Sequence, residues 1–233
     1  MPIDAILFDK DGTLFDFSAT WSTTTRQVIH HLSGNDPALA VTLAEIAGFD
    51  LDSGAFAPES ILIAWSNRDI AERLVLALPG RSVAEIEHQM IAAATTATLA
   101  PAVPLAGFLD GLAARGLALG VMTNDAETSA LHHLETAGVL DRFAFIAGFD
   151  SGHGAKPAPD PLLAFCRAVG AAPARAAMVG DSTHDLVAGR AAGMITIGVL
   201  TGLADFAELD RHADVVLPDI GHIPDWLTGW AAG

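Results

Sequence analysis

The sequence predicts a doubly wound α/β fold, in which a mostly parallel sheet carries helices on both faces and an all-helical domain is inserted. Short apolar runs alternate with helical patterns through the second half of the chain. Polar residues directly follow several of these runs, at the strand ends where such sheets bind ligands. Between residues 16 and 97, in contrast, only helical patterns occur.

Six apolar runs have the length and composition of buried strands. They lie at residues 4–8, 117–122, 143–147, 176–179, 194–199 and 214–217. Helical patterns occur at residues 105–115, 126–137, 160–169 and 184–192. This alternation predicts parallel strands with helices packed on both sides of the sheet.

The second predicted domain is helical throughout. Its patterns cover residues 20–32, 37–48, 58–78 and 82–98, with Ser, Pro and Gly between them. We therefore expect a core domain made of residues 1–15 and 98–233, and a helical domain made of residues 16–97. Residues 16–18 and 99–104 would connect the two domains.

Composition narrows the function. A net charge of −16 argues against nucleic acid and anionic membrane surfaces as partners. An anionic substrate would need a local positive centre, such as a metal ion, a lysine or a helix N-terminus. The single cysteine, Cys166, excludes an intrachain disulfide, and the N-terminus lacks the pattern of a signal peptide. We therefore expect a cytoplasmic protein, and the sequence leaves its oligomeric state open.

An acidic pair follows the first predicted strand. Asp9 and Asp11 stand two residues apart, so on an extended chain their side chains point to the same side. Two like charges this close are costly unless a cation or a proton relieves them. Gly12 permits a sharp turn and Thr13 adds a hydroxyl. The pair alone is compatible with an ordinary acidic turn, or it predicts a divalent metal, acid–base chemistry, or both.

Further polar residues follow other predicted strands or lie in a glycine-rich loop. They are Thr123, Asn124, Asp125, Lys156, Asp181 and Asp185. Because the carboxyl ends of parallel strands meet at one edge of a sheet, we expect Asp9, Thr123 and Asp181 to converge there.

This set of residues resembles the four motifs of haloacid-dehalogenase-type phosphohydrolases: an opening D-x-D-G-T, a hydroxyl, a lysine and a second acidic pair. The resemblance covers residues 1–15 and roughly 100–200, and the helical insert is similar to the type 1 cap of that superfamily. The D-x-D-G-T opening and the helical insert look most like those of the phosphoglycolate phosphatase branch. The resemblance implies a phosphatase with a Rossmann-like core, acting on a small phosphorylated metabolite.

The resemblance also implies roles for the motif residues. Asp9 would be the nucleophile that forms an aspartyl-phosphate, and Asp11 the acid that protonates the leaving group and then activates water. Thr123 and Asn124 would bind phosphoryl oxygens, although capping of the next helix explains them equally well. Lys156 would neutralise Asp9 and a phosphoryl oxygen.

The implied cofactor is Mg²⁺, a hard cation that prefers oxygen ligands beside phosphate. The carboxylates of Asp9 and Asp181 and the main-chain carbonyl of Asp11 would be direct ligands. Asp185 would bind either directly or through water. Its spacing from Asp181 places both carboxylates on one side of a helix that starts between them.

Other polar side chains have less defined roles. Lys10 projects to the opposite side of the strand end from the acidic pair, so we expect it near the site edge without a chemical role, solvated or salt-bridged. Substrate specificity would come from the helical domain, where any candidate is alternatively an ordinary helix residue. The candidates are Trp21, Arg26, His30, Trp65, Asn67 and Arg68.

Three alternatives remain at this point. A sugar-phosphate mutase resembling β-phosphoglucomutase would share the core, the cap type and the motifs. A phospho-receiver signalling domain would share an acidic cluster, a Thr and a Lys-Pro, but the acidic pair here follows the first strand and a helical insert interrupts the sheet. A degraded pseudoenzyme is disfavoured because each motif position is filled.

Overall fold

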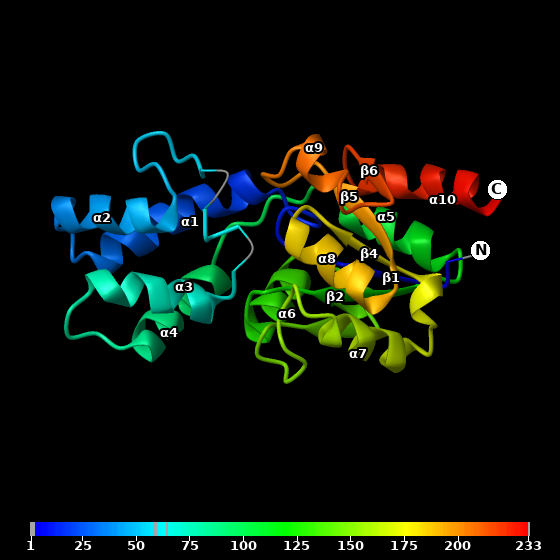
Figure 1. Ribbon diagram of the computed structural model, residues 1–233, viewed down its shortest axis with the longest axis horizontal. Helices are drawn as coiled ribbons and strands as arrows, with labels where there is room; N and C mark the ends of the chain where they lie inside the picture. The colour runs from blue at the N-terminus through cyan, green and yellow to red at the C-terminus, as the bar shows by residue number, and fades with distance from the viewer. Residues whose placement is uncertain (1–2, 58–59, 64, 233) are drawn as a thin grey trace.

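The computed structural model describes residues 3–57, 60–63 and 65–232 (Figure 1). Its six strands form one parallel sheet in the order β3-β2-β1-β4-β5-β6. The strands are β1 (Ala5–Phe8), β2 (Ala118–Met122), β3 (Phe145–Ala147), β4 (Ala176–Gly180), β5 (Ile195–Val199) and β6 (Val215–Leu217). All six match the predicted runs, and β1, which precedes the acidic pair, lies in the middle of the sheet.

Helices cover both faces of the sheet, which confirms the predicted doubly wound class. Ile6 and Phe8 of β1 face α5 (Leu105–Ala113), α6 (Glu127–Thr136) and α10 (Ile223–Ala232). Leu7 faces the other way, toward α7 (Asp160–Val169) and α8 (Thr183–Ala192). The short helix α9 (Phe206–Leu209) follows β5. Helix α10 was not predicted from the sequence.

The helical insert lies at one end of the molecule and contains its own apolar core (Figure 1). It contains α1 (Phe17–Leu32), α2 (Pro37–Ala47), α3 (Asn67–Leu74), a 3₁₀ turn (Val75–Ala77) and α4 (Val83–Thr95). We call these helices the cap. The prediction of one helix over residues 58–78 is wrong. Residues 60–63 contain turns, and α3 begins only after its N-cap residue, Ser66. Residues 58–59 lie outside the described residues.

The two connections between cap and core run side by side. The Asp16 N–H donates to the Ala100 carbonyl at 2.8 Å, and the Ala102 N–H donates to the Leu14 carbonyl at 2.9 Å. Division of the chain at residues 15/16 and 97/98 stays a prediction.

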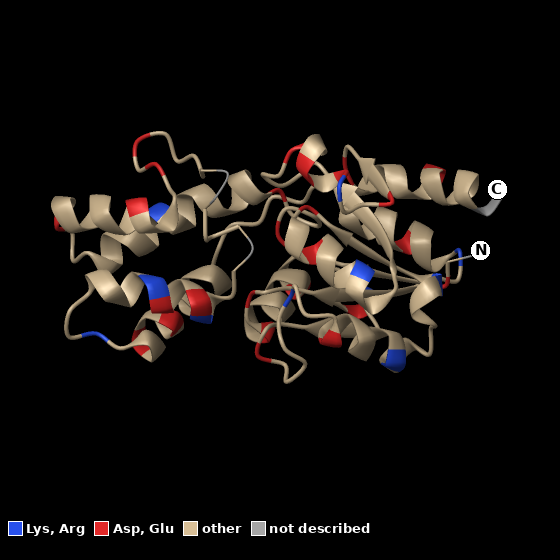
Figure 2. Ribbon diagram, in the orientation of Figure 1, with Lys and Arg blue, Asp and Glu red and all other residues tan. Residues whose placement is uncertain are grey.

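Figure 2 shows acidic residues on cap and core alike. Among the helices of the described residues, none has the length and hydropathy needed to cross a membrane.

Candidate active site at the carboxyl ends of the strands

A buried lysine bridges two carboxylates at the edge of the sheet. Lys156 Nζ lies 2.5 Å from Asp9 Oδ1 and 2.6 Å from Asp185 Oδ1. Asp9 directly follows β1, and Asp185 lies in the first turn of α8, which follows β4. Because buried charges need compensation, this contact explains how the three groups coexist out of water. The structure thus brings the predicted Asp9, Lys156 and Asp185 together.

Asp181 adds a third buried carboxylate. Oxygen atoms of Asp9, Asp181 and Asp185 lie within 4.8 Å of one another. Asp181 Oδ1 accepts a hydrogen bond from the Thr13 hydroxyl at 3.3 Å, whereas Oδ2 has no partner among the described residues. An unpartnered buried oxygen is costly, so its presence beside two further carboxylates points to a cation site.

Two glycines press against Asp181. A Cβ added at Gly12 or at Gly202 would overlap the Asp181 carboxylate. Gly12 also has a φ of 77°, a left-handed conformation that glycine adopts at little cost. Gly202 was missed from the sequence, although its place shortly after the fifth apolar run follows the same strand-end logic as the other site residues.

Burial, together with the excess of carboxylates, shifts the pKa values of the site carboxyl groups. Burial raises the pKa of Asp9 to about 7; the Lys156 ammonium opposes this shift, and Asp185 and Asp11 add to it. Burial, with Asp9 and Asp185, raises the pKa of Asp181 well above its usual range. For Lys156, burial works against the charge, but Asp185 and Asp9 prevail and raise its pKa. The carboxylate set therefore favours binding of a proton or a cation.

Asn124 anchors the loop that carries the lysine. Its side-chain amide donates to the Lys156 carbonyl at 2.9 Å, and its side-chain oxygen accepts from the Lys156 N–H at 2.9 Å. The alternative prediction, in which Asn124 caps α6, is therefore wrong, because the N-cap residue of that helix is Ala126. The Thr123 hydroxyl accepts from the Asp125 N–H at 3.1 Å, and the Asp125 carboxylate accepts from the N–H of Ala126, which precedes α6.

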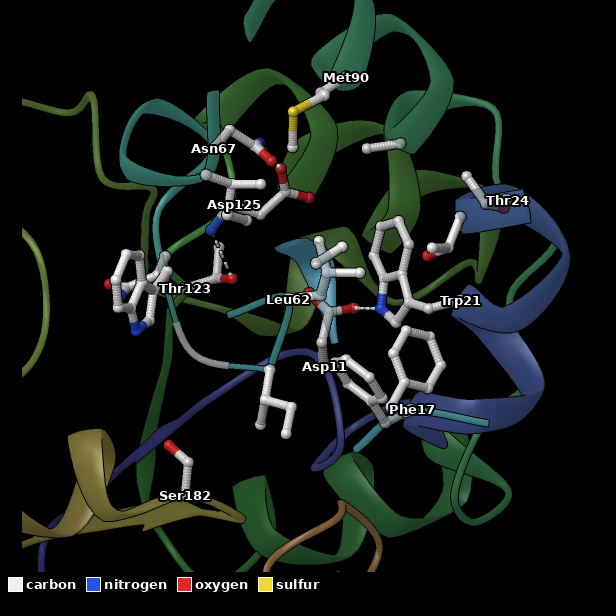
Figure 3. Close-up of a pocket in the computed structure, with 18 of the residues that line it drawn as sticks. Asp11, Phe17, Trp21, Thr24, Leu62, Asn67, Met90, Thr123, Asp125 and Ser182 are labelled. Atoms are coloured by element: carbon white, nitrogen blue, oxygen red, sulfur yellow. Dashed lines mark hydrogen bonds between the residues drawn. The ribbon is translucent and has the colours of Figure 1, made fainter. Parts of the chain in front are cut away.

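Asp11 lies apart from the three-carboxylate cluster and bonds to the cap. Its Oδ1 accepts from the indole N–H of Trp21, on α1, at 2.9 Å (Figure 3). Its Oδ2 is paired with Lys10 Nζ at 2.7 Å. Lys10 is fully buried and also lies 3.3 Å from Asp125 Oδ2. The salt-bridged alternative for Lys10 is thus the one observed, and the solvated one is wrong. The expected projection away from the acidic pair is also wrong, because the ammonium pairs with Asp11.

His133 completes the surroundings of Lys10. Its Nδ1 lies 3.1 Å from Lys10 Nζ, and its Nε2 lies 2.7 Å from the carbonyl oxygen of Ala94 on α4. Since the ammonium can only donate, Nδ1 must accept and Nε2 must carry the proton. Burial lowers the pKa of His133, and the Lys10 charge lowers it further. A neutral His133 therefore links the buried lysine to the cap.

This neutral ring makes stability depend on pH. Because the folded-state pKa of His133 is lowered, the folded protein binds this proton less readily than the unfolded chain, whose value is near 6.5. The stabilisation is present above pH 6.5 and is lost as pH falls through the folded-state pKa. Between about pH 7.5 and pH 5, urea unfolding should show a larger loss of stability in wild type than in His133→Gln. Equal losses would contradict this assignment.

A cavity of about 120 Å³ separates the strand ends from the cap. Of the six cap candidates, Trp21, Trp65 and Asn67 line it, and the Asn67 amide donates to Asp125 Oδ1 at 2.8 Å (Figure 3). The others are not among its described lining residues: Arg26, which donates to a main-chain carbonyl, His30, and Arg68. Three of the candidates thus lie where a substrate could meet them.

Comparison with known proteins agrees with this geometry. Residues 3–193 match the model of the haloacid dehalogenase-like hydrolase family. A phosphoglycolate phosphatase from Rhodospirillum rubrum is 32% identical over 239 residues, which cover 96% of this chain and 90% of that enzyme. The chain spans about half the length of several other curated phosphoglycolate phosphatases that it matches.

Solved structures share the fold. A predicted phosphoglycolate phosphatase from Haemophilus somnus superposes with a TM-score of 0.70 at 19% identity, over 96% of this chain and 97% of that one. A putative β-phosphoglucomutase from Thermotoga maritima superposes with a TM-score of 0.67 at 19% identity, over 97% of this chain and 99% of that one. The chain belongs to the haloacid dehalogenase-like hydrolase family, as its motifs predict, and its full-length relative indicates a phosphatase within that family.

Proposed function

We propose that the protein is a Mg²⁺-dependent phosphatase that hydrolyses a small-molecule phosphate monoester through an aspartyl-phosphate on Asp9. The observation that carries the proposal is the buried contact of Lys156 with Asp9 and Asp185, beside the unpartnered Asp181 oxygen and at the mouth of a cavity. Relatives described as phosphoglycolate phosphatases support the same reaction class.

In the proposed reaction, a carboxylate oxygen of Asp9 attacks phosphorus, and the bond from phosphorus to the ester oxygen breaks. Asp11, which lines the cavity, gives a proton to the departing alkoxide. It then takes a proton from a water molecule whose oxygen attacks the phosphorus of the aspartyl-phosphate. The bond to Asp9 breaks, and the products are an alcohol and inorganic phosphate.

Neighbouring residues would position the phosphoryl group. The Thr123 hydroxyl accepts from the main chain, so its own hydrogen can donate to a phosphoryl oxygen. Lys156 would contact another oxygen while holding the Asp9 charge. Asn124, predicted to bind substrate, would act by fixing the Lys156 main chain. Positioning and charge neutralisation supply most of the rate in phosphoryl transfer.

The donor set fits a divalent cation. Asp9 and Asp181 would hold it through carboxylate oxygens, together with the main-chain carbonyl of Asp11. Asp185 would hold it through water, because its oxygens already accept from the Lys156 ammonium and from the main-chain N–H and hydroxyl of Ser182, the N-cap residue of α8. Mg²⁺ is the usual hard cation beside phosphate. When bound, it would offset the carboxylate charge and stabilise charge on the phosphoryl oxygens.

Replacing Asp181 tests the cation site without an activity assay. Asp181→Asn removes one of three mutually repelling buried carboxylates, so the metal-free variant should melt at a higher temperature than metal-free wild type. Mg²⁺ should then raise the melting temperature of wild type and leave that of the variant nearly unchanged. An equal Mg²⁺ shift in both proteins would contradict the assignment of Asp181.

Phosphate release tests the reaction itself. A panel of esters, including 2-phosphoglycolate and hexose phosphates, would be incubated with Mg²⁺ or with EDTA. Mg²⁺-dependent release from at least one ester is the expected result. Conversion of a sugar phosphate to an isomer without release would favour the mutase, whereas no turnover by folded, Mg²⁺-loaded protein would contradict both. Membership of a hydrolase family argues against the receiver-domain alternative.

A further inference from the structure

We propose that the leaving alcohol of the substrate is apolar and bulky, an alkyl or aryl group instead of a carboxylate or a sugar. The inference rests on the proposed phosphatase reaction and concerns the part of the substrate that the cap would hold. The cavity has apolar walls, the one lysine of its described lining is already paired with carboxylates, and several polar groups of the cap already make hydrogen bonds within the protein.

The far walls of the cavity are apolar. From Asp9 and Lys156 at the strand ends, the cavity extends between the cap helices. Its cap side includes Phe17, Ile29, Phe56, Ile70, Leu74 and Met90, all of which are buried. Figure 3 shows Phe17, Trp21, Leu62 and Met90 around the space. Since protein interiors pack with few voids larger than a water molecule, a cavity of about 120 Å³ between such residues is suited to an apolar ligand.

The cavity offers little to a second negative charge. Among its described lining residues, Lys156 is the only lysine or arginine, and its ammonium is paired with Asp9 and Asp185. The one histidine, His184, belongs to the core end. Asp11 and Asp125 add further carboxylates to the lining. A carboxylate such as that of 2-phosphoglycolate would thus be desolvated without a cation to pair with, which is strongly unfavourable.

Three arginines lie near the cap lining in sequence, and two of them are engaged elsewhere. Arg26 donates to the main-chain carbonyl of Leu51 at 3.0 Å. Arg68 is paired with Glu72 and Glu87 on the cap surface. Arg73 lines an adjoining groove that shares Lys156 with the cavity and also contains two acidic residues, Asp69 and Glu72. None of the three is among the residues that line the cavity.

Polar groups in the cap are also too few for a sugar. The Trp21 indole N–H already donates to Asp11, and the Asn67 amide donates to Asp125. Thr24, Thr25 and the indole N–H of Trp65 are the other polar cap groups of the described lining. A sugar with several hydroxyls would leave most of them without a hydrogen bond, and sites that bind such groups provide a partner for each.

The test is a series of primary alkyl phosphates from ethyl to hexyl, with 2-phenylethyl phosphate, 2-phosphoglycolate and glucose 6-phosphate in parallel. The alkyl leaving groups have nearly equal basicity, so differences in kcat/KM for Mg²⁺-dependent phosphate release report contact with the cavity. We expect kcat/KM to rise roughly two- to fourfold for each added methylene. Hexyl phosphate should exceed 2-phosphoglycolate by at least about 100-fold.

A cation placed in the cavity should reverse this preference. Thr25 is a half-buried lining residue on α1, so a lysine there can place its ammonium in the cavity. Thr25→Lys should lower kcat/KM for hexyl phosphate and raise it for 2-phosphoglycolate, changing their ratio by more than about tenfold. Leu76→Lys is the matched control, because Leu76 is 77% exposed and is not a lining residue, and it should leave the ratio unchanged.

The outcomes separate the two proposals. Phosphate release that is flat along the alkyl series, with 2-phosphoglycolate or glucose 6-phosphate preferred, would overturn the apolar leaving group and leave the phosphatase standing. Absence of release from each ester by folded, Mg²⁺-loaded protein would overturn both. An unchanged substrate ratio in folded Thr25→Lys would also contradict the assignment of this cavity to the leaving group.

Discussion

Replacing Asp9 with Asn is expected to lower kcat/KM for phosphate release by at least about 10⁴-fold, the scale of loss when a covalent nucleophile is removed. The amide cannot form the acyl phosphate, and it no longer carries the charge that pairs with Lys156 at 2.5 Å. Initial rates at subsaturating ester concentrations, in the presence of Mg²⁺, measure the loss.

Asp4→Asn provides the matched control. Asp4 lies just before the same strand, is paired with Arg175 and is about half exposed. Its replacement should change the rate less than about twofold, because surface ion pairs contribute little. Melting temperatures of both variants would show that they fold. If Asp9→Asn kept activity within tenfold of wild type, the nucleophile would have to be another group.

Replacing Lys10 with Met should give the largest loss of stability, about 3–5 kcal/mol in the free energy of unfolding. Lys10 is fully buried, and its ammonium neutralises Asp11 at 2.7 Å and Asp125 at 3.3 Å. Methionine has a similar shape but leaves both carboxylates without their cation in a poorly solvated place. Urea unfolding near neutral pH measures the change.

Two comparisons sharpen this prediction. Arg142→Met breaks an ion pair with Asp110 at the surface and should cost less than about 1 kcal/mol. Adding Asp125→Asn to Lys10→Met removes one of the stranded charges and should restore part of the stability. A loss below about 1 kcal/mol in Lys10→Met would mean that the pairs contribute no more than surface pairs do.

The sheet and the strand-end residues could be predicted because both follow from local patterns. An apolar run of five residues between turn residues is too short for a typical helix and favours a buried strand. Parallel strands in turn bring their carboxyl ends together at one edge of the sheet. Asp9, Lys156, Asp181 and Asp185 accordingly meet where the sequence predicts. Their catalytic and metal-binding roles stay predictions until the variants are measured.

Contacts between distant segments could not be predicted in the same way. Alternation along the chain predicts that Lys10 projects away from the acidic pair, whereas its ammonium pairs with Asp11 and lies beside His133, 123 residues later. Nor does alternation reveal that Asn67 of the cap reaches Asp125. These contacts depend on how the cap packs against the core, which a single sequence does not encode locally.

The helix over residues 58–78 was mispredicted for a related reason. Its composition favours a helix, yet the Ser60 hydroxyl donates to the Ala47 carbonyl at 2.6 Å and accepts from the Leu62 N–H. These bonds fix a turn beside α2 and delay the helix until Asn67. A tertiary contact outweighs local propensity here, as it commonly does in short helices.

The side-by-side connections at Asp16 and Ala100 hold the two ends of the cap together. Because its entry and exit are already fastened together, an insert of almost any length closes there at an entropic cost that grows only logarithmically with length. Replacement of the insert would leave the strand order intact but would remove the hydrogen bonds from Trp21 to Asp11 and from Asn67 to Asp125, and a new insert would supply a different wall for the leaving group. Selectivity can therefore change with the insert, provided that the replacement contacts Asp11 and Asp125 as Trp21 and Asn67 do.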